Sequence, residues 1–282
     1  MEPRRRLGLL LVTPLGLMLL GVFVLPLAVM LPTSFRPYTA GGPAPIGWTA
    51  ENYVEIATDP YFHEVLGRTF TMGALVTLTC LVAGYPLAYV LARSRGPARS
   101  WLTLLVVFPL LLNLVVRSFG WISLLANHGL VNNTLLALDL ITEPLKLMYN
   151  LTGLIIGLSH IFLPFMVLVL VAALQALPRD VEAASGTLGA GPVKTFLLVT
   201  LPLTVPGMFA GCVLVFVLTI SALVTPRLLG GPAYKVMATV IYDEFLATLD
   251  WPSGAALAFV LTLVALLVVT GAGLVARQWS AR

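Results

Sequence analysis

Six long apolar stretches dominate this sequence, and apart from Arg117 none of them contains Asp, Glu, Lys or Arg. A helix needs about 20 apolar residues to cross the hydrocarbon core of a bilayer, and each charge at mid-membrane would cost roughly 2.5–3.5 kcal/mol. Backbone hydrogen bonds must be satisfied inside each segment, so helices are expected rather than strands. The stretches predict six transmembrane helices at residues 7–31, 69–92, 101–126, 151–177, 201–224 and 255–276.

Composition supports this all-α membrane class over a soluble globular fold. Hydrophobic residues make up 59% of the chain and charged residues 10%, whereas soluble domains carry about 25% charged residues. We expect one transmembrane domain over residues 1–282. The first stretch resembles a signal peptide because three arginines precede it, but its apolar run is too long and no small-residue cleavage site follows Leu31. We therefore expect a retained span.

The distribution of positive charge predicts the orientation. With the N-terminus inside, ten of the 16 Lys and Arg residues fall on the cytoplasmic side, at positions 4, 5, 6, 93, 95, 99, 179, 194, 277 and 282. The positive-inside rule favours this topology, which places both termini in the cytoplasm. The basic charge is thus a signal of orientation and lipid surface rather than of nucleic-acid binding.

Signatures of chemistry are missing from the sequence. His63, His128 and His160 are scattered, with His160 expected to pack between helices, and Cys80 and Cys212 lie in apolar runs as small packing residues. There is no phosphate-binding loop, nucleophile elbow, H-E-x-x-H motif or intramembrane carboxylate pair. We expect no catalytic residue, no metal site and no cofactor on this chain, which is therefore not predicted to be an enzyme.

The most informative loop joins the fourth and fifth stretches on the predicted cytoplasmic side, at residues 178–200. Asp180 is expected to cap a short helix, with Glu182 in its first turn where the helix dipole favours an anion. The Gly-Ala-Gly run at 189–191 should end that helix, and Pro192 suits the first turn of a second one. Helix signals alone leave two interpretations open: an ordinary connector, or a rigid knob that seats in a partner.

The residues of this loop resemble a known signature. Glu182-Ala183-Ala184, Leu188-Gly189-Ala190 and Leu201-Pro202 resemble the cytoplasmic "EAA" motif of permease subunits of binding-protein-dependent ABC importers. The runs at 220–231, 235–238 and 250–256 are similar to spermidine/putrescine-type permeases. One position differs, because Glu182 precedes Gly189 by seven residues instead of the usual six. Either one residue is inserted near Gly186, or Ala183 occupies the place of the glutamate.

This resemblance implies a type I ABC importer fold in the inner membrane, with residues 1–282 as one permease domain. It implies two separate ATPase subunits that carry ATP and Mg, a second permease (a similar chain or a copy of this one), an extracytoplasmic solute-binding protein and the surrounding membrane lipid. The cargo is expected to be a polyamine or a related small organic solute. Leu188 and Ala184 would form an apolar seat for the ATPase. The implied coupling residues are Glu182, Ala183, Ala184, Leu188, Gly189, Ala190 and Pro192.

Four polar residues are candidates for the translocation pathway: Asn113, Arg117, Asp243 and Glu244. Arg117 either snorkels to the outer interface, lines the route, or pairs with an acidic loop residue. Asp243 and Glu244 either attract a cationic solute or belong to a solvated loop. The alternative function is an ion-coupled secondary transporter, which would need buried ionisable residues that the spans almost entirely lack.

Overall fold

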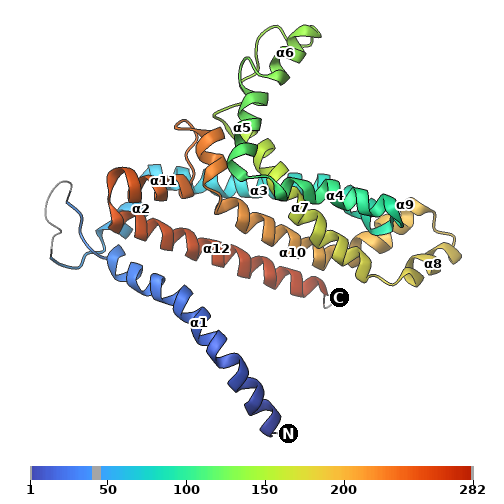
Figure 1. Cartoon of the computed structure of the whole chain (residues 1–282), viewed down its shortest axis with the longest axis horizontal. Coiled ribbons are helices and arrows are strands. Elements are labelled where there is room, and N and C mark those ends of the chain that lie inside the picture. The colour runs from blue at the N-terminus through green and yellow to red at the C-terminus, as the bar shows by residue number, and fades with distance from the viewer. Residues whose placement is uncertain (1, 40–45, 281–282) are drawn as a thin grey trace. The chain divides into compact units, whose positions relative to one another are not determined.

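The computed structural model describes residues 2–39 and 46–280, and within them it contains helices, turns and loops but no strand. Arg282, predicted above to lie inside, is outside the described residues. The chain forms two compact units, one built from residues 1–63 and 240–262 and the other from 64–239 and 263–282. Figure 1 shows the helices coloured in the order of the chain.

The described residues include six helical segments long and apolar enough to cross a membrane, which confirms the predicted number and the all-α class. Their bounds are Thr13–Ser34, Pro60–Arg93, Leu114–Ala137, Leu151–Ala176, Pro192–Ile220 and Trp251–Leu274. Several boundaries differ from the predicted ones. The second segment begins at Pro60 rather than residue 69, the third covers Leu114–Ala137 rather than 101–126, and the fifth covers Pro192–Ile220 rather than 201–224.

The first unit contains α1 (Glu2–Ser34), α2 (Glu51–Thr58), η3 (Glu244–Thr248) and the start of α12 (Trp251–Ser280). The apolar side chains of α1 beyond residue 12 are almost all exposed, so this helix packs against little of its own chain. Hydrogen bonds from one side chain join the end of α1 to α2. The Asn52 amide donates to the Ser34 and Arg36 carbonyls at 2.8 and 3.0 Å.

The core of the second unit is made by α3 (Pro60–Arg93), α7 (Leu151–Ala176) and α10 (Leu201–Ile220). Gly207 and Gly211 form a G-x-x-x-G pair on α10, a pattern that lets membrane helices approach closely. A Cβ at Gly207 would lie 2.2 Å from the Ala173 side chain, and one at Gly211 would lie 2.7 Å from the Met166 sulfur. The contact between α7 and α10 therefore depends on these two glycines.

The third predicted stretch, residues 101–126, is not one helix. It divides into α4 (Pro97–Leu111) and α5 (Leu114–Leu125), with Leu112 and Asn113 in extended backbone between them. α4 lies along α7, whereas α5 and then α6 (Leu130–Ala137) project away from the helix bundle (Figure 1). The break follows Pro109, which removes one helical donor. Arg117, the charged residue of this apolar stretch, lies inside α5.

The remaining elements of this unit are short. They are α8 (Arg179–Thr187), α9 (Pro192–Thr195), η1 (Phe196–Thr200) and η2 (Pro226–Gly230), whereas α11 (Met237–Asp243) spans the boundary between the units at residue 240. The π-helical η1 runs directly into α10, and the Leu201 N–H donates to the Phe196 carbonyl five residues earlier. Such a wide turn holds one residue more than a regular α-helical turn.

Candidate functional site

The segment at residues 178–200, named the elbow segment below, folds into two short helices with a glycine turn between them. Gly189 adopts φ +82°, and its N–H bonds to the Gly186 carbonyl while the Ala190 N–H bonds to the Ser185 carbonyl. This pattern is a Schellman motif, in which a residue without Cβ is favoured at the left-handed position. The glycine break, and Pro192 in the first turn of α9, are confirmed.

The start of α8 differs from the expectation. Pro178 occupies the N-cap, with no side-chain cap, and Asp180 lies inside the first turn. Proline readily precedes a helix because its ring fixes φ near the helical value, so the helix starts before Asp180 can cap it. Asp180 and Glu182 are both in the first turn, where negative charge is stabilised by the helix dipole.

Glu182 joins the elbow segment to the rest of the unit. Its carboxylate forms an ion pair with Arg93, the last residue of α3, and accepts a 2.7 Å hydrogen bond from Thr200 in η1. The two charged side chains are only 27% and 22% exposed. A second contact joins the two halves of the elbow, since the Ser185 and Thr195 hydroxyls lie 2.7 Å apart. We call the Glu182–Arg93–Thr200 contacts the latch.

Aromatic rings continue the latch into the bundle. The Arg93 guanidinium lies 4.8 Å from the centre of the Tyr89 ring, and Phe196 of η1 meets Tyr89 and Tyr85 edge to face at 5.4 and 5.7 Å. The Tyr85 hydroxyl in turn lies 2.7 Å from that of Thr204 on α10. Cation–π and edge-to-face contacts each add to the area burial of these rings, so the elbow is attached to α3 by charge and by packing.

The opposite side of the elbow segment faces outward. Leu188 is 88% exposed, and Ala184, one helical turn earlier, is exposed beside it. Ala183 is also exposed, whereas Glu182 is turned toward α3. Helix α8 runs continuously through Gly186. Whether one residue is inserted near Gly186 or Ala183 occupies the place of the glutamate stays a prediction.

Sequence reasoning missed the partners of Glu182. Arg93 was counted only as one of the positive charges that set the orientation, and Thr200 and Thr195 were not considered. The usable signal was a single arginine ending an apolar stretch beside a loop that holds a carboxylate. Its partner remained open because 89 residues separate Arg93 from Glu182.

The two pathway candidates of the third stretch, Asn113 and Arg117, contact backbone groups at the helix break. Asn113 is the N-cap of α5 and accepts from the Val115 N–H at 2.8 Å. Arg117 is 9% exposed and donates to the Leu112 carbonyl at 2.8 Å. Both therefore satisfy backbone groups that the break leaves without helical partners. The other two guanidinium nitrogens of Arg117 are buried without a partner in the described part of the chain, and its place at the outer interface or on the route stays a prediction.

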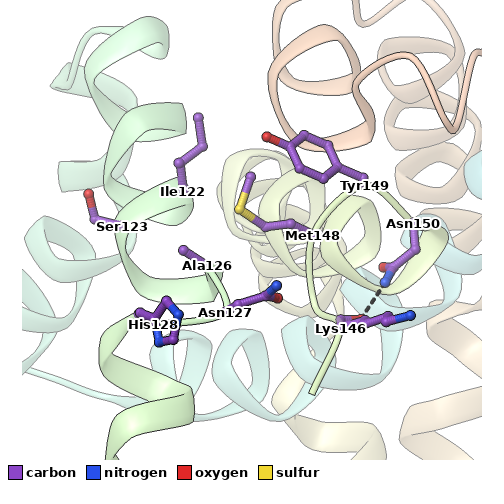
Figure 2. Close-up of a pocket in the computed structure, with 10 residues that line it drawn as sticks. Ile122, Ser123, Ala126, Asn127, His128, Lys146, Met148, Tyr149 and Asn150 are labelled. Carbon is purple, nitrogen blue, oxygen red and sulfur yellow. Dashed lines mark hydrogen bonds between the residues drawn. The ribbon is translucent and has the colours of Figure 1, made fainter. Parts of the chain in front are cut away.

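A cavity of about 750 Å³ lies where α5, the turn after it and the loop before α7 meet (Figure 2). Its lining carries Lys146 and His128, with the amides of Asn127 and Asn150 and an apolar side from Met148. It holds no carboxylate among its lining residues. This pocket lies at the start of α7, whose far end leads into the elbow segment, so the two features are at opposite ends of one helix of 26 residues.

Asp243 and Glu244 belong to the first unit, whereas Asn113 and Arg117 belong to the second. Glu244 accepts a 2.6 Å hydrogen bond from Thr248 within its own π-helical turn. The grouping of all four residues in one pathway stays a prediction. Elsewhere, the predicted packing role of His160 agrees with a 3.3 Å bond from the Trp121 indole. Among the described residues, no cluster of His, Cys, Asp and Glu is arranged to hold a metal.

Comparison with known proteins identifies the class of this fold. Residues 84–280 match the family model described as "Binding-protein-dependent transport system inner membrane component". The chain belongs to this family. It is 36% identical to the spermidine/putrescine transport system permease protein PotB of Escherichia coli (strain K12), across 90% of this chain and 92% of that one. It is also 30% identical to the molybdenum transport system permease protein ModB of Mycobacterium bovis, across 77% and 81%.

The fold also matches a solved importer. The crystal structure of a bacterial alginate ABC transporter, in complex with an alginate pentasaccharide-bound periplasmic protein, contains a chain that aligns with a TM-score of 0.79 at 18% identity, across 98% of this chain and 96% of that one. These findings confirm a multi-pass permease subunit of a binding-protein-dependent ABC importer in the inner membrane. They favour the importer over the ion-coupled alternative.

Proposed function

We propose that this chain forms half of the translocation pathway of an ATP-driven importer, with the elbow segment as the contact for a separate ATPase subunit. The observation that carries the proposal is the two-sided elbow. One side is attached to α3 through the latch, and the other presents Leu188 and Ala184, both exposed. An apolar side chain so exposed is suited to a partner's groove.

The latch would transmit movement of the elbow segment to the transmembrane helices. A push on the elbow reaches α3 through Arg93 and reaches α10 along the uninterrupted backbone of η1. Both helices belong to the packed core with α7, so they would move as one body. Rigid movement of such a body, driven by ATP and Mg on the ATPase, would alternate access between the two sides of the membrane.

The assembly we propose holds two ATPase subunits, a second permease and an extracytoplasmic solute-binding protein, with both termini of this chain in the cytoplasm. The elbow and the pocket of Figure 2 lie at opposite ends of α7. With the elbow in the cytoplasm, the pocket would face the binding protein. The cytoplasmic placement rests on the positive charge at Arg93, Arg95 and Arg99.

For the cargo, we propose a polyamine or a related small organic solute. Support comes from the PotB relative, whose name gives spermidine and putrescine. The ModB relative carries a different cargo name at comparable identity, so the permease alone constrains the solute weakly. Uptake of labelled spermidine by the reconstituted complex, with putrescine as competitor, tests this choice separately from the importer mechanism. Spermidine transport that is absent while ATP-dependent uptake of another solute persists would overturn the cargo alone.

The coupling role is tested by Leu188→Asp and Ala184→Asp in the assembled complex in liposomes. A carboxylate in an apolar seat must be desolvated without a partner. We therefore expect ATP hydrolysis to continue while uptake falls at least tenfold, with normal amounts of the chain in the membrane. Leu188→Met keeps size and apolarity and should transport normally. Normal uptake by both aspartate variants would refute the coupling assignment.

A further inference from the structure

A second cavity, of about 350 Å³, lies at the turn between α3 and α4, beside the end of α7. Three arginines line it, Arg93, Arg95 and Arg99, together with Ser94 and Gln175. No acidic residue lines it. A pocket walled by guanidinium groups is suited to an anion with several oxygens, because each guanidinium offers a fork of N–H donors to phosphate.

Two of the three arginines are available. Arg93 is engaged by Glu182, but Arg95 and Arg99 are exposed and make no side-chain hydrogen bond or ion pair with the described part of the chain. The pocket is also the place where α4 begins, with Gly96 as N-cap and no side-chain cap. The positive end of the helix dipole adds to the two free charges. The pocket thus carries two uncompensated cations.

An apolar ridge begins one turn beyond the pocket. On α4, Leu102 and Val106 pack against the core, while the opposite face presents Trp101 at 71% and Leu105 at 69% exposure. The exposed ridge continues through Leu104, Phe108 and Leu111. From residue 101 to 111 a helix rises about 15 Å, which is the depth of one hydrocarbon leaflet. Tryptophan at the start of such a ridge is typical of the membrane interface.

We propose that the α3–α4 pocket binds the phosphate of an anionic phospholipid, with an acyl chain along the exposed ridge of α4. Charge selects an anion, and the exposed apolar face of the same helix favours an amphiphile over a free phosphate or a carboxylate from a protein. Basic pockets between membrane helices bind anionic headgroups in this way. The site needs only that α4 lies in a bilayer, so its failure would leave the importer proposal untouched.

The test is native mass spectrometry of the purified full chain in detergent, titrated with phosphatidylglycerol, phosphatidylcholine or inorganic phosphate. We expect phosphatidylglycerol to bind in preference to the other two. The double variant Arg95→Gln/Arg99→Gln should bind it about 30-fold more weakly, from the contribution of two charges near a headgroup. The control Arg36→Gln/Lys194→Gln removes two exposed charges outside the pocket and should change binding less than threefold.

A separate pair of substitutions tests the contribution of the apolar ridge to lipid binding. Trp101→Ala/Leu105→Ala should weaken phosphatidylglycerol binding while leaving the weak binding of glycerol phosphate, which has no acyl chain, unchanged. Equal binding of phosphatidylglycerol by Arg95→Gln/Arg99→Gln and wild type would overturn the proposal, as would equal binding of phosphatidylcholine. Inorganic phosphate that displaces the lipid at equal concentration would assign the pocket to free phosphate instead. A photo-crosslinker at position 95 that captures a protein subunit in the complex would assign it to that subunit.

Discussion

Replacing Glu182 by Gln tests whether the latch holds the elbow segment in place. The variant keeps the size of the side chain and an oxygen that can accept from Thr200, but removes the charge that pairs with Arg93. Exposed ion pairs contribute 0.2–1 kcal/mol, and hydrogen bonds to charged groups about 1.5–3 kcal/mol. With the two side chains 27% and 22% exposed, the latch falls between these limits, at about 1–2 kcal/mol.

This magnitude fixes the expected signal. Loss of about 1–2 kcal/mol raises the population of the detached elbow about 5- to 30-fold. Amide hydrogen exchange over residues 179–200 measures that population directly, because local opening exposes these N–H groups without global unfolding. In the reconstituted complex, the looser elbow should lower the uptake obtained for each ATP hydrolysed, while hydrolysis itself continues.

Asp180→Asn is the matched control. Asp180 lies in the same first turn of α8, is exposed, and makes no side-chain hydrogen bond or ion pair with the described part of the chain, and its replacement removes the same charge. Its exchange rates should change less than twofold. The charge-reversed pair Arg93→Glu/Glu182→Arg should recover part of the loss, which isolates the pairwise energy. If Glu182→Gln exchanges no faster than Asp180→Asn, the latch is an incidental contact and the reasoning fails.

Three further predictions concern single residues. Gly189→Ala should destabilise the elbow by about 1 kcal/mol, since alanine resists a φ of +82°, whereas Gly186→Ala should stabilise α8. Amide hydrogen exchange over residues 179–200 distinguishes the two variants, and equal effects would contradict the Schellman assignment. Gly207→Val should lower the melting temperature of the purified chain or abolish its folding, because a Cβ at this position already collides with α7. The control Gly271→Ala, where a Cβ meets open space, should melt as wild type does. Similar melting of both variants would contradict the close approach of α7 and α10. Arg117→Met should retain or raise the melting temperature, because a buried, incompletely hydrogen-bonded cation is removed. The same variant should reduce solute uptake if Arg117 lines the translocation route, and unchanged uptake would limit Arg117 to supporting the helix break.

Local signals were sufficient for the number of spans and for the glycine turn. Length and apolarity determine where helices cross a bilayer, and Gly189 and Pro192 carry turn chemistry that does not depend on distant residues. The break at Leu112 was hidden because an apolar residue occupies it and its cause, Pro109, is compatible with a helix that only kinks. Asn113, marked as a pathway candidate, was a detectable N-cap.

Long-range pairing was beyond the sequence. The ion pair of Arg93 with Glu182 depends on how α3 and α8 are brought together by the whole unit. The same is true of Phe196, whose position between Tyr85 and Tyr89 follows from the π-helical turn that contains it. No local propensity marks a π-turn in the run Phe-Leu-Leu-Val-Thr, which reads equally well as an ordinary helix.

The widened turn at residues 196–200 also determines how far the elbow segment is rotated about the axis of α10. One residue in a helix corresponds to a rotation of about 100°, so a deletion that restored a regular α-turn there would swing everything before it by that angle. Glu182 would then point away from Thr200, and Leu188 would be presented in another direction. A relative of this chain that is one residue longer or shorter in this stretch would therefore need a compensating change elsewhere in the elbow segment. Without that change, it would present a different surface to its ATPase subunit.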